Sequence, residues 1–289
     1  MYQYAVSVHV SQIQCPEWRK ALGRSKFKRI ELSYSDSPTM DELSSLIAAI
    51  QSDNNMNGIE ITSVHFPFFP FGKFQYKDLQ ICREAIDFLK SFMKTAAQLH
   101  PKHFTFHPSI EPIAPEDRTL LITNTRKVIE ESAETAAELG ASFNVELLPR
   151  TCIGNTPEEI LALTDGIPEA GICFDVNHLT FENGAARVPE FIDQLRNRIR
   201  TFHLSDYDSI DESHWLPGIG LLNWPQVMDA IRRIPGTPLL IFETAIIKPN
   251  GITKRDITPE HHFHMLERAA FYLENCRELD LRANELTLP

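Results

Sequence analysis

Residues that can bind a metal ion or move a proton follow several short apolar segments of this chain. The clearest case is Asp175, which ends an apolar run and is followed three residues later by His178. Further residues of this kind stand at or just after the ends of other apolar runs: His65, His107, Glu146, His203 and Glu243. Carboxylates and imidazoles act as general acids and bases and as ligands of divalent cations. The pattern therefore indicates metal-dependent or acid–base chemistry.

The elements that would position these residues alternate along the chain. Short β-rich runs are separated by longer amphipathic stretches, as in repeated βα units with a parallel sheet. The runs are Tyr4 to Val10, Phe27 to Leu32, Ile59 to Val64, His103 to Phe106, Ser142 to Leu147, Ile172 to Phe174, Ile199 to Leu204 and Leu239 to Phe242. A parallel barrel collects the carboxyl ends of its strands at one face. We predict an α/β fold, a (βα)8 TIM barrel, with the chemistry at that face.

The stretches between the runs carry helix signals. Pro157 follows Thr156 and Pro225 lies two residues after Asn223, which is the arrangement of a proline in the first turn behind a polar cap. Gly140 is typical of a helix end. The predicted helices are Asp41 to Gln51, Lys77 to Leu99, Pro115 to Leu139, Pro157 to Leu163, Pro189 to Arg196, Pro225 to Arg233 and Pro259 to Asn275, with a weaker one near Pro16 to Leu22.

Composition limits the class of protein. The 289 residues, 43% of them hydrophobic, suit one barrel domain spanning residues 1–289, and no Pro/Gly/Ser-rich linker divides them. Lys and Arg total 28 against 39 Asp and Glu, a net charge of −11, which opposes general attraction to nucleic acid or anionic membranes. The five cysteines are scattered, which favours free thiols. Without a signal peptide pattern or a run of spanning length, we expect a soluble, cytoplasmic protein.

Four of the strand-end residues form a plausible ligand set for one cation. Glu146, Asp175, His203 and Glu243 combine carboxylate oxygen with imidazole nitrogen and contain no sulfur, which suits Mn, Co, Zn or Mg without selecting one. A carboxylate beside an apolar strand is costly without a partner, and a cation would supply it. Asp206 is expected behind the His203 ring, because a ligating imidazole usually donates its other N–H to a carboxylate or carbonyl.

The remaining histidines admit both functional and structural interpretations. His65 and His107 either contact substrate or metal, or cap the loops that follow their strands. His178 can face the same site as Asp175, and His214, in a glycine-containing loop, can reach over the barrel mouth. The Phe-rich run 66–74 is either a lid against which a sugar stacks or a hydrophobic plug. His9 is interpreted as barrel packing.

The last-helix histidines are interpreted as surface or core residues away from the mouth: His261, His262 and His264.

Taken in order along the strands, these motifs resemble the xylose isomerase-like TIM barrel superfamily. The matching segments are the strand ends at His65 and His107, Asn144-Val145-Glu146, Asp175-x-x-His178, His203-Leu204-Ser205-Asp206, Pro217-Gly218-x-Gly220 followed by Trp224, and Phe242-Glu243-Thr244. The resemblance spans most of the chain. It implies a metal site at Glu146, Asp175, His203 and Glu243, with His178 and His65 holding substrate.

Sugar isomerases and epimerases of this superfamily act by proton abstraction next to a carbonyl through an enediolate. The resemblance implies that Glu146 and Glu243 are the acid/base pair acting on a small carbohydrate. The chain departs from keto-sugar epimerases in one respect, because it has no Lys or Arg between Arg200 and Arg232. If the substrate carried a phosphate, the cation that binds it would have to come from another loop; the candidates are Lys73, Arg150, Arg187 and Lys248.

Other activities remain open on the same barrel. The endonuclease IV type of zinc-dependent phosphodiesterase uses comparable strand ends, with Glu212 in place of an Asp before His214, although the acidic balance and the segment 147–150 after Glu146 depart from that family. A polyol dehydratase and a non-enzymatic carbohydrate- or partner-binding barrel are further alternatives. The sequence also leaves open a homo-oligomer, while the net charge of −11 speaks against nucleic acid as a partner.

Overall fold

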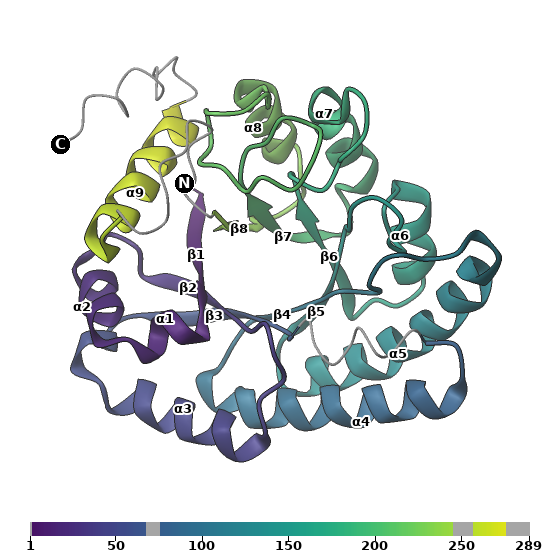
Figure 1. Ribbon diagram of the computed structural model, residues 1–289, viewed down its shortest axis with the longest axis horizontal. Coiled ribbons are helices and arrows are strands. Elements are labelled where there is room, and N and C mark those ends of the chain that lie inside the picture. Colours follow the sequence, from purple (N-terminus) through teal and green to yellow (C-terminus); the bar gives the residue numbers. More distant parts are fainter. Residues whose placement is uncertain (1, 68–75, 245–256, 276–289) are drawn as a thin grey trace.

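Eight parallel strands close into a barrel in the computed structural model, which describes residues 2–67, 76–244 and 257–275 (Figure 1). Each strand pairs with the next along the chain, and β8 pairs with β1. The strands are β1 (Gln3–His9), β2 (Arg29–Ser33), β3 (Glu60–His65), β4 (His103–Phe106), β5 (Ser142–Glu146), β6 (Ala170–Asp175), β7 (Ile199–Leu204) and β8 (Leu239–Phe242). The predicted TIM barrel and all eight predicted strands are confirmed.

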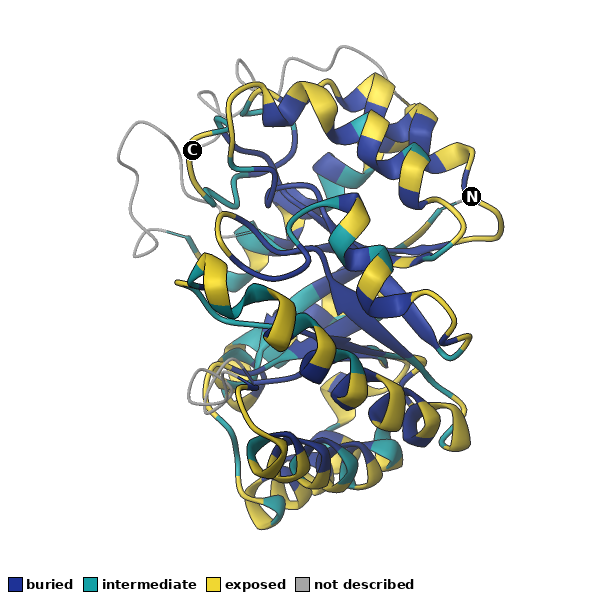
Figure 2. Ribbon diagram, turned by 90° about the vertical axis from the view of Figure 1, so that its right-hand side faces the viewer, coloured by how far each residue is buried: buried dark blue, intermediate teal, exposed yellow. Residues whose placement is uncertain are grey.

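A ring of helices surrounds the strands (Figure 1). Their bounds are α1 (Val10–Gln14), α2 (Pro16–Arg24), α3 (Met40–Ser52), α4 (Leu79–Ala96), α5 (Arg118–Glu138), α6 (Pro157–Thr164), α7 (Gly184–Leu195), α8 (Trp224–Arg232) and α9 (Pro259–Asn275). Figure 2 shows the strands buried in the middle and the helices exposing one face. Two sequence signals act as predicted, because the side chains of Thr156 and Asn223 cap α6 and α8.

Phenylalanines at consecutive strands supply much of the apolar core. Phe106 and Phe143 have ring centroids 5.2 Å apart, and Phe174 and Phe202 are 5.6 Å apart. All four side chains are fully buried. Burial of such a side chain stabilises the fold by about 1.5–3 kcal/mol. The strands are therefore fixed by packing that does not involve the polar residues at their ends.

Two differences from the predicted element boundaries have a clear physical cause. The chain turns into α1 directly after His9, whose ring accepts from Ser11 N and caps this helix, so His9 is a cap and not barrel packing alone. Helix α7 begins at Gly184, five residues before Pro189, which lies inside the helix. A Cβ at position 184 would lie 1.8 Å from Leu179 O, so only glycine allows this close helix start.

The described helices and cysteines agree with the expectations from composition. None of these helices is long and apolar enough to cross a bilayer. Four described cysteines, at positions 15, 82, 152 and 173, carry free thiols, and all but Cys15 are buried. The scattered cysteine spacing therefore does not produce a disulfide among them.

Candidate active site

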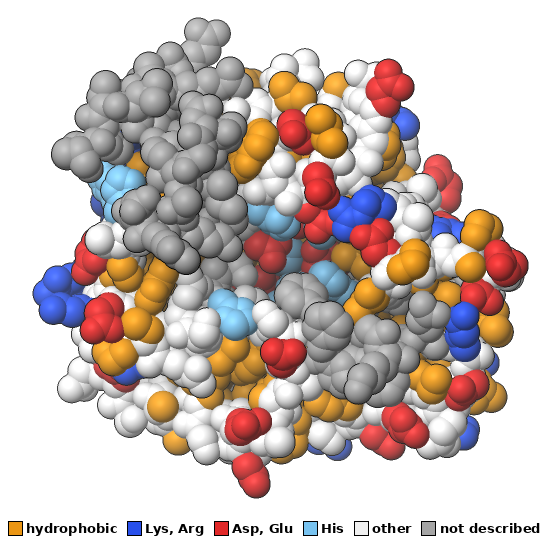
Figure 3. All heavy atoms as spheres, in the orientation of Figure 1, with side chains coloured by type: hydrophobic (Ala, Val, Ile, Leu, Met, Phe, Trp, Pro, Cys, Tyr) orange, Lys and Arg blue, Asp and Glu red, His pale blue; other side chains and the backbone are white. Residues whose placement is uncertain are grey.

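The predicted metal ligands converge at the carboxyl end of the barrel. Glu146 and Asp175 are the last residues of β5 and β6, His203 lies in β7, and Glu243 directly follows β8. Each offers a ligand atom within 4.8 Å of those of the other three. Acidic and histidine side chains fill the central hollow of the face seen in Figure 3. The structure thus places the four predicted metal ligands, which come from four consecutive strands, close together.

His203 lies close to each of the other three members of this cluster. Its Nδ1 lies 3.3 Å from Glu146 Oε1, 3.1 Å from Glu243 Oε2 and 3.8 Å from Asp175 Oδ2. Burial alone would lower the pKa of His203, but the neighbouring Cys173 and the carboxylates of Glu243, Glu31 and Glu146 raise that pKa well above its usual value. Nδ1 of His203 therefore faces three carboxyl groups. Even a protonated His203 ring would leave this cluster with a net negative charge when the carboxyl groups are ionised.

The pKa values of the three carboxyl groups in this cluster shift in different directions. Burial would raise the pKa of Glu146 and of Glu243, but the histidines near each hold both pKa values below the usual range, chiefly His107 and His203 for Glu146 and His203 for Glu243. Burial raises the pKa of Asp175 well above its usual value. Its Oδ2 accepts no hydrogen bond from the described residues. The His178 and His203 nitrogens stand 3.4 and 3.8 Å from it. An orphaned, buried carboxylate oxygen among three other ligand groups fits a divalent cation.

A carboxylate that the sequence analysis missed lies behind His203. Glu31 Oε1 is 3.1 Å from Nε2, the ring nitrogen turned away from the metal ligands. Its other oxygen accepts hydrogen bonds from Ser63 at 2.7 Å and Thr105 at 3.2 Å. Burial would raise the pKa of Glu31, but His203 holds it below the usual value. Glu31 therefore fixes the ring orientation, which is the role expected of Asp206. The sequence signal that could have identified Glu31 was a charged residue in the middle of an apolar strand.

Asp206 instead organises the loop after β7, so its predicted position was wrong. Its carboxylate accepts from Trp224 Nε1 and Gly218 N, both at 2.8 Å, and from Leu222 N at 3.2 Å. Its backbone pairs with Trp215. A Cβ on Gly220 would lie 2.3 Å from Asp206 Oδ1, so this loop requires glycine there. Asp206, Gly218 and Trp224 thus stabilise the loop after β7 through these hydrogen bonds. The same loop carries His214 and places it at the barrel mouth.

His65 and His107 approach the other oxygen of Glu146. The Nε2 atoms of both rings lie 3.0 Å from Glu146 Oε2. His65 Nδ1 contacts Phe66 O at 2.7 Å, which orients its ring. Burial would lower the pKa of His65, but Glu146 raises it, whereas burial dominates for His107 and lowers its pKa. His65, His107 and Glu146 form a second group that can hold an ion.

His178 and His214 lie on the opposite side of the cluster. His178 Nδ1 contacts Leu147 O at 2.7 Å, and its Nε2 is 3.4 Å from Asp175 Oδ2 and 3.7 Å from Glu212 Oε2. His214 Nδ1 contacts Glu243 O at 3.2 Å. Asp175, His178 and His214 are a third group with ligand atoms close enough for one ion. The four histidines predicted to bind substrate therefore all border the metal-ligand cluster.

The cations proposed as phosphate contacts are used elsewhere. Arg150 pairs with Glu111, Asp211 and Glu212, which joins the loops after β4, β5 and β7. Arg187 pairs with Glu190 in α7 and lies 5.0 Å from the centre of the Phe191 ring.

Lys73 and Lys248, the other two candidates, and most of the Phe-rich run 66–74 lie outside the described residues.

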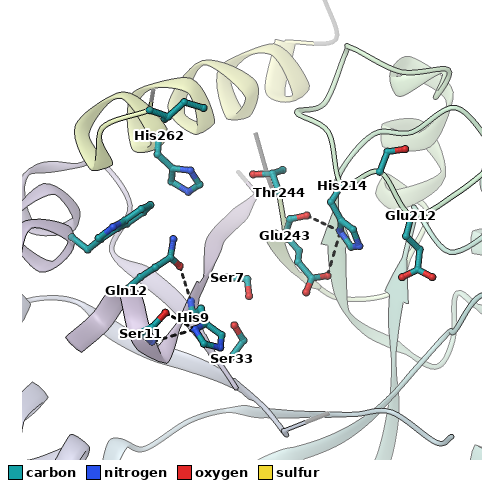
Figure 4. Close-up of a pocket in the computed structure, with 13 residues that line it drawn as sticks. Ser7, His9, Ser11, Gln12, Ser33, Glu212, His214, Glu243, Thr244 and His262 are labelled. Carbon is teal, nitrogen blue, oxygen red and sulfur yellow. Dashed lines mark hydrogen bonds and ion pairs between the residues drawn. The ribbon is translucent and has the colours of Figure 1, made fainter. Parts of the chain in front are cut away.

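A cavity of about 550 Å³ extends from the metal-ligand cluster across the mouth (Figure 4). Glu212, His214 and Glu243 line one side of it. The other side is formed by α1, α2 and α9 and the ends of β1 and β2; its residues include Ser7, His9, Trp18, Ser33 and His262. His262 was interpreted as lying away from the mouth, which is wrong, because α9 leans over this face (Figure 4). Only tertiary packing places it there.

The chain belongs to the xylose isomerase-like TIM barrel family, whose model matches residues 19–260. Among solved structures, a D-tagatose 3-epimerase-like protein is 20% identical with a TM-score of 0.72, covering 94% of this chain and 98% of its own. A D-psicose 3-epimerase in the presence of D-fructose is 16% identical with a TM-score of 0.72, covering 94% and 99%. The IOLI protein with a bound zinc atom is 16% identical with a TM-score of 0.66, covering 94% and 97%. At these identities the likeness is one of fold.

Proposed function

We propose that this protein is a divalent-metal-dependent sugar isomerase or epimerase that abstracts a proton next to a carbonyl. One observation carries the proposal: Glu146 and Glu243 belong to the same four-residue ligand group as Asp175 and His203. Two ionised carboxylates beside one cation position suit proton exchange on a bound sugar. Family membership and the sugar epimerases among the structural neighbours support this class of reaction.

Each residue has a distinct task in this proposal. A divalent ion held by Glu146, Asp175, His203 and Glu243 would supply a Lewis acid for the substrate carbonyl and its neighbouring hydroxyl. Glu146 and Glu243 exchange protons with opposite faces of one carbon or with neighbouring carbons. Their lowered pKa values keep both carboxylates ionised at neutral pH. Glu31 holds the His203 ring in place.

The surrounding histidines bind the substrate or position Glu146. His178 turns Nε2 toward Asp175 because Nδ1 is occupied by Leu147 O. His214 is oriented in the same way by Glu243 O, whereas His65 contacts Phe66 O through Nδ1 and Glu146 Oε2 through Nε2, so it would act on the substrate by positioning Glu146. His107, which is 20% exposed, faces the opening beside Glu146. Imidazoles held in this way hydrogen-bond sugar hydroxyls in a fixed orientation, which is the preorganisation that a proton transfer requires.

Hydrogen exchange with the solvent tests the reaction class. Purified protein loaded separately with Mn, Co, Zn and Mg is incubated in deuterated water with a panel of ketoses and aldoses. We expect deuterium on the carbon next to the carbonyl for at least one sugar, and loss of exchange after chelation. Absence of exchange for every sugar and metal would contradict the proposal and favour a polyol dehydratase or a phosphodiesterase.

A zinc-dependent phosphodiesterase is the second candidate, and a specific observation favours it. Three further ligand groups of the described residues overlap the central one: His65 and His107 with Glu146, Cys173 with Glu146 and His203, and His178 and His214 with Asp175. Such overlapping groups suit several zinc ions, which can clamp the attacking and leaving oxygens of a phosphodiester. The net charge of −11 opposes this reading, since DNA binding depends on neutralising phosphates.

Metal stoichiometry separates the two candidates. Elemental analysis of zinc-loaded protein should give about one ion per chain for an isomerase and two or three for a phosphodiesterase. A salt titration of binding to an abasic DNA duplex provides the matching functional measurement. Sub-micromolar affinity at physiological salt, with cleavage at the lesion, would replace the isomerase proposal with the phosphodiesterase.

A further inference from the structure

The cavity at the barrel mouth has two chemically different sides. The side formed by β7 and β8 and their loops carries Glu212, His214 and Glu243. We call the opposite side the distal pocket and define it by Ser7, His9, Trp18, Ser33 and His262. Figure 4 shows these two sets of residues facing one another across the cavity. A ligand that reaches from one side to the other would meet charges at one end and uncharged polar groups at the other.

Strand register explains why two hydroxyls face this pocket. Ser7 pairs with Glu31, and His9 pairs with Ser33, in neighbouring parallel strands. Because side chains alternate along a strand, Ser7 and Ser33 lie on the same side of the sheet as Glu31, which faces His203 inside the barrel. Both serines are half-buried. Neither hydroxyl is hydrogen-bonded to the other residues drawn in Figure 4, so each can bind a ligand.

The aromatic and imidazole residues of the pocket carry no positive charge at neutral pH. The His9 ring nitrogens contact the Ser11 and Ser35 hydroxyls at 2.7 and 3.1 Å, and burial lowers the pKa of His9. Burial lowers the pKa of His262 to about 4. His262 also packs against Trp18, with ring centroids 5.1 Å apart. Trp18 thus presents an apolar wall of the kind that sugar C–H groups contact.

Cations that could bind a phosphate are missing from the described lining of the cavity. It contains Glu212 and Glu243 but neither Lys nor Arg. Arg150, the described cation next to Glu212, is occupied by three carboxylates. A phosphate dianion in the distal pocket would meet only uncharged groups among the described residues, without the cationic bidentate partner that such a group usually binds, and the two carboxylates on the other side of the cavity would oppose its entry.

Resting on the proposed function, we propose that the distal pocket binds the uncharged, hydroxyl-bearing end of a non-phosphorylated sugar, with the Ser7 and Ser33 hydroxyls as hydrogen-bond partners and Trp18 as the apolar wall. The described lining of the cavity therefore favours free sugars over sugar phosphates as the substrate class. The carbonyl end of the sugar lies at Glu243, and the opposite end points toward β1 and β2.

Matched sugar pairs test this assignment on the full-length, metal-loaded protein. The probes are D-fructose against D-fructose 6-phosphate and D-ribulose against D-ribulose 5-phosphate, with Kd measured by titration calorimetry. We expect at least one free ketose to bind at least ~10-fold more tightly than its phosphate. Equal or tighter binding of the phosphates, or no binding of either free ketose, overturns the proposal.

Two sets of variants locate the effect in the distal pocket. Ser7→Ala and Ser33→Ala should each weaken binding of the free ketose about tenfold, the loss of one hydrogen bond, with unchanged metal content. Ser33→Arg supplies the missing cation and should shift the preference toward the phosphate. Ser45→Ala, on the exposed face of α3, is the control and should bind like the wild type. Unchanged affinities in both alanine variants would contradict the assignment.

The same measurements separate this proposal from the isomerase assignment. A free ketose that binds through Ser7 and Ser33 without deuterium exchange would support the distal pocket and refute the isomerase reaction. A sugar phosphate that is bound and exchanged in preference to the free sugar would support the isomerase and refute the distal pocket.

Discussion

The same strands carry polar residues at both ends of the barrel, and the two ends use them in opposite ways. At the amino-terminal end, Asn144 Nδ2 lies 3.2 Å from His103 Nδ1, and the Ser142 hydroxyl donates to Asn144 Oδ1 at 2.8 Å. Arg198, just before β7, donates to three backbone carbonyl oxygens. These amide, hydroxyl and terminal guanidinium groups have partners, as stability requires of groups withdrawn from water, whereas Arg198 Nε has none among the described residues.

At the carboxyl end, the polar groups compete for partners. Glu146 meets four histidines, His203 meets three carboxylates on one nitrogen, and Asp175 Oδ2 accepts no hydrogen bond from described residues. Such an arrangement costs stability unless a cation or substrate completes it. The difference indicates which end of a barrel is built for chemistry, and it predicts different results for substitutions at the two ends.

The largest expected effect is on catalysis at the carboxyl end. Glu146→Gln and Glu243→Gln should each reduce deuterium exchange into a substrate ketose by roughly 10²–10⁴-fold, the usual contribution of a positioned base. Both glutamates are also proposed ligands, so metal content is measured on each variant. Full exchange by a metal-loaded variant of either residue would show that the two-base assignment is wrong.

Asp175→Asn separates metal binding from folding. The substitution removes a proposed ligand, so zinc affinity should fall at least ~10-fold. In metal-free protein it also removes a carboxyl group whose ionised form is disfavoured by burial, so the free energy of unfolding should rise by about 1 kcal/mol. Thermal unfolding with and without zinc checks both effects. Zinc should raise the Tm of the wild type and leave that of the variant nearly unchanged.

A lower unfolding free energy for metal-free Asp175→Asn would contradict the contrast between the ends, because it would mean that Asp175 supports the fold. The core phenylalanines give a reason to expect otherwise, since they are fully buried and their rings pack against one another.

Sequence reasoning located the carboxyl end well because its signals are local. Each ligand, such as Asp175 or Glu146, follows its own apolar run, and a parallel barrel brings strand ends together whatever the details of packing. Reasoning from local sequence position placed Asp206 wrongly and did not identify Glu31. Asp206 is close to His203 in sequence but turns into its loop, whereas Glu31 reaches His203 across the barrel from β2.

The distal pocket could not be predicted from the sequence for the same physical reason. Ser7 and Ser33 are ordinary strand residues, and only the register between β1 and β2 brings them to one side of the cavity. His262 reaches the mouth because α9 packs across α2, which places it against Trp18. Contacts between elements distant in sequence leave no local pattern.

Gly171→Ala tests the amino-terminal end on the same strand that carries Asp175. A Cβ at Gly171 would lie 2.5 Å from both Arg200 Cγ and Asn144 Oδ1, so the pairing of Asn144 must shift. We expect a loss of about 1–3 kcal/mol in the free energy of unfolding, as for other overpacked sites. Denaturant unfolding measures it. Zinc content and exchange rate per folded molecule should stay at wild-type values, the reverse of Asp175→Asn.

The smallest expected effect is a pH dependence of stability at His103. Burial lowers the pKa of His103 to about 4, with Arg200 and Lys102 lowering it further and Glu31 opposing them. The Asn144 amide donates to His103 Nδ1, so the folded protein holds the neutral ring. The unfolded chain takes up its proton near pH 6.5, about the usual value for histidine. Stability from this group is therefore complete above about pH 6.5 and is lost progressively toward pH 4.

His103→Gln isolates this contribution. Replacing the ring removes a group that binds protons in the unfolded state only, so the variant should lose on the order of 1–2 kcal/mol less than the wild type between pH 6.5 and pH 4. Urea unfolding of metal-free protein at a series of pH values gives the comparison, with Lys94→Gln, at an exposed position of α4, as the control. Identical pH profiles for wild type and His103→Gln would mean that the ring is not held neutral. A polar group at the amino-terminal end would then lack its partner, as groups at the mouth do. The proposed difference between the two ends of the barrel would be wrong.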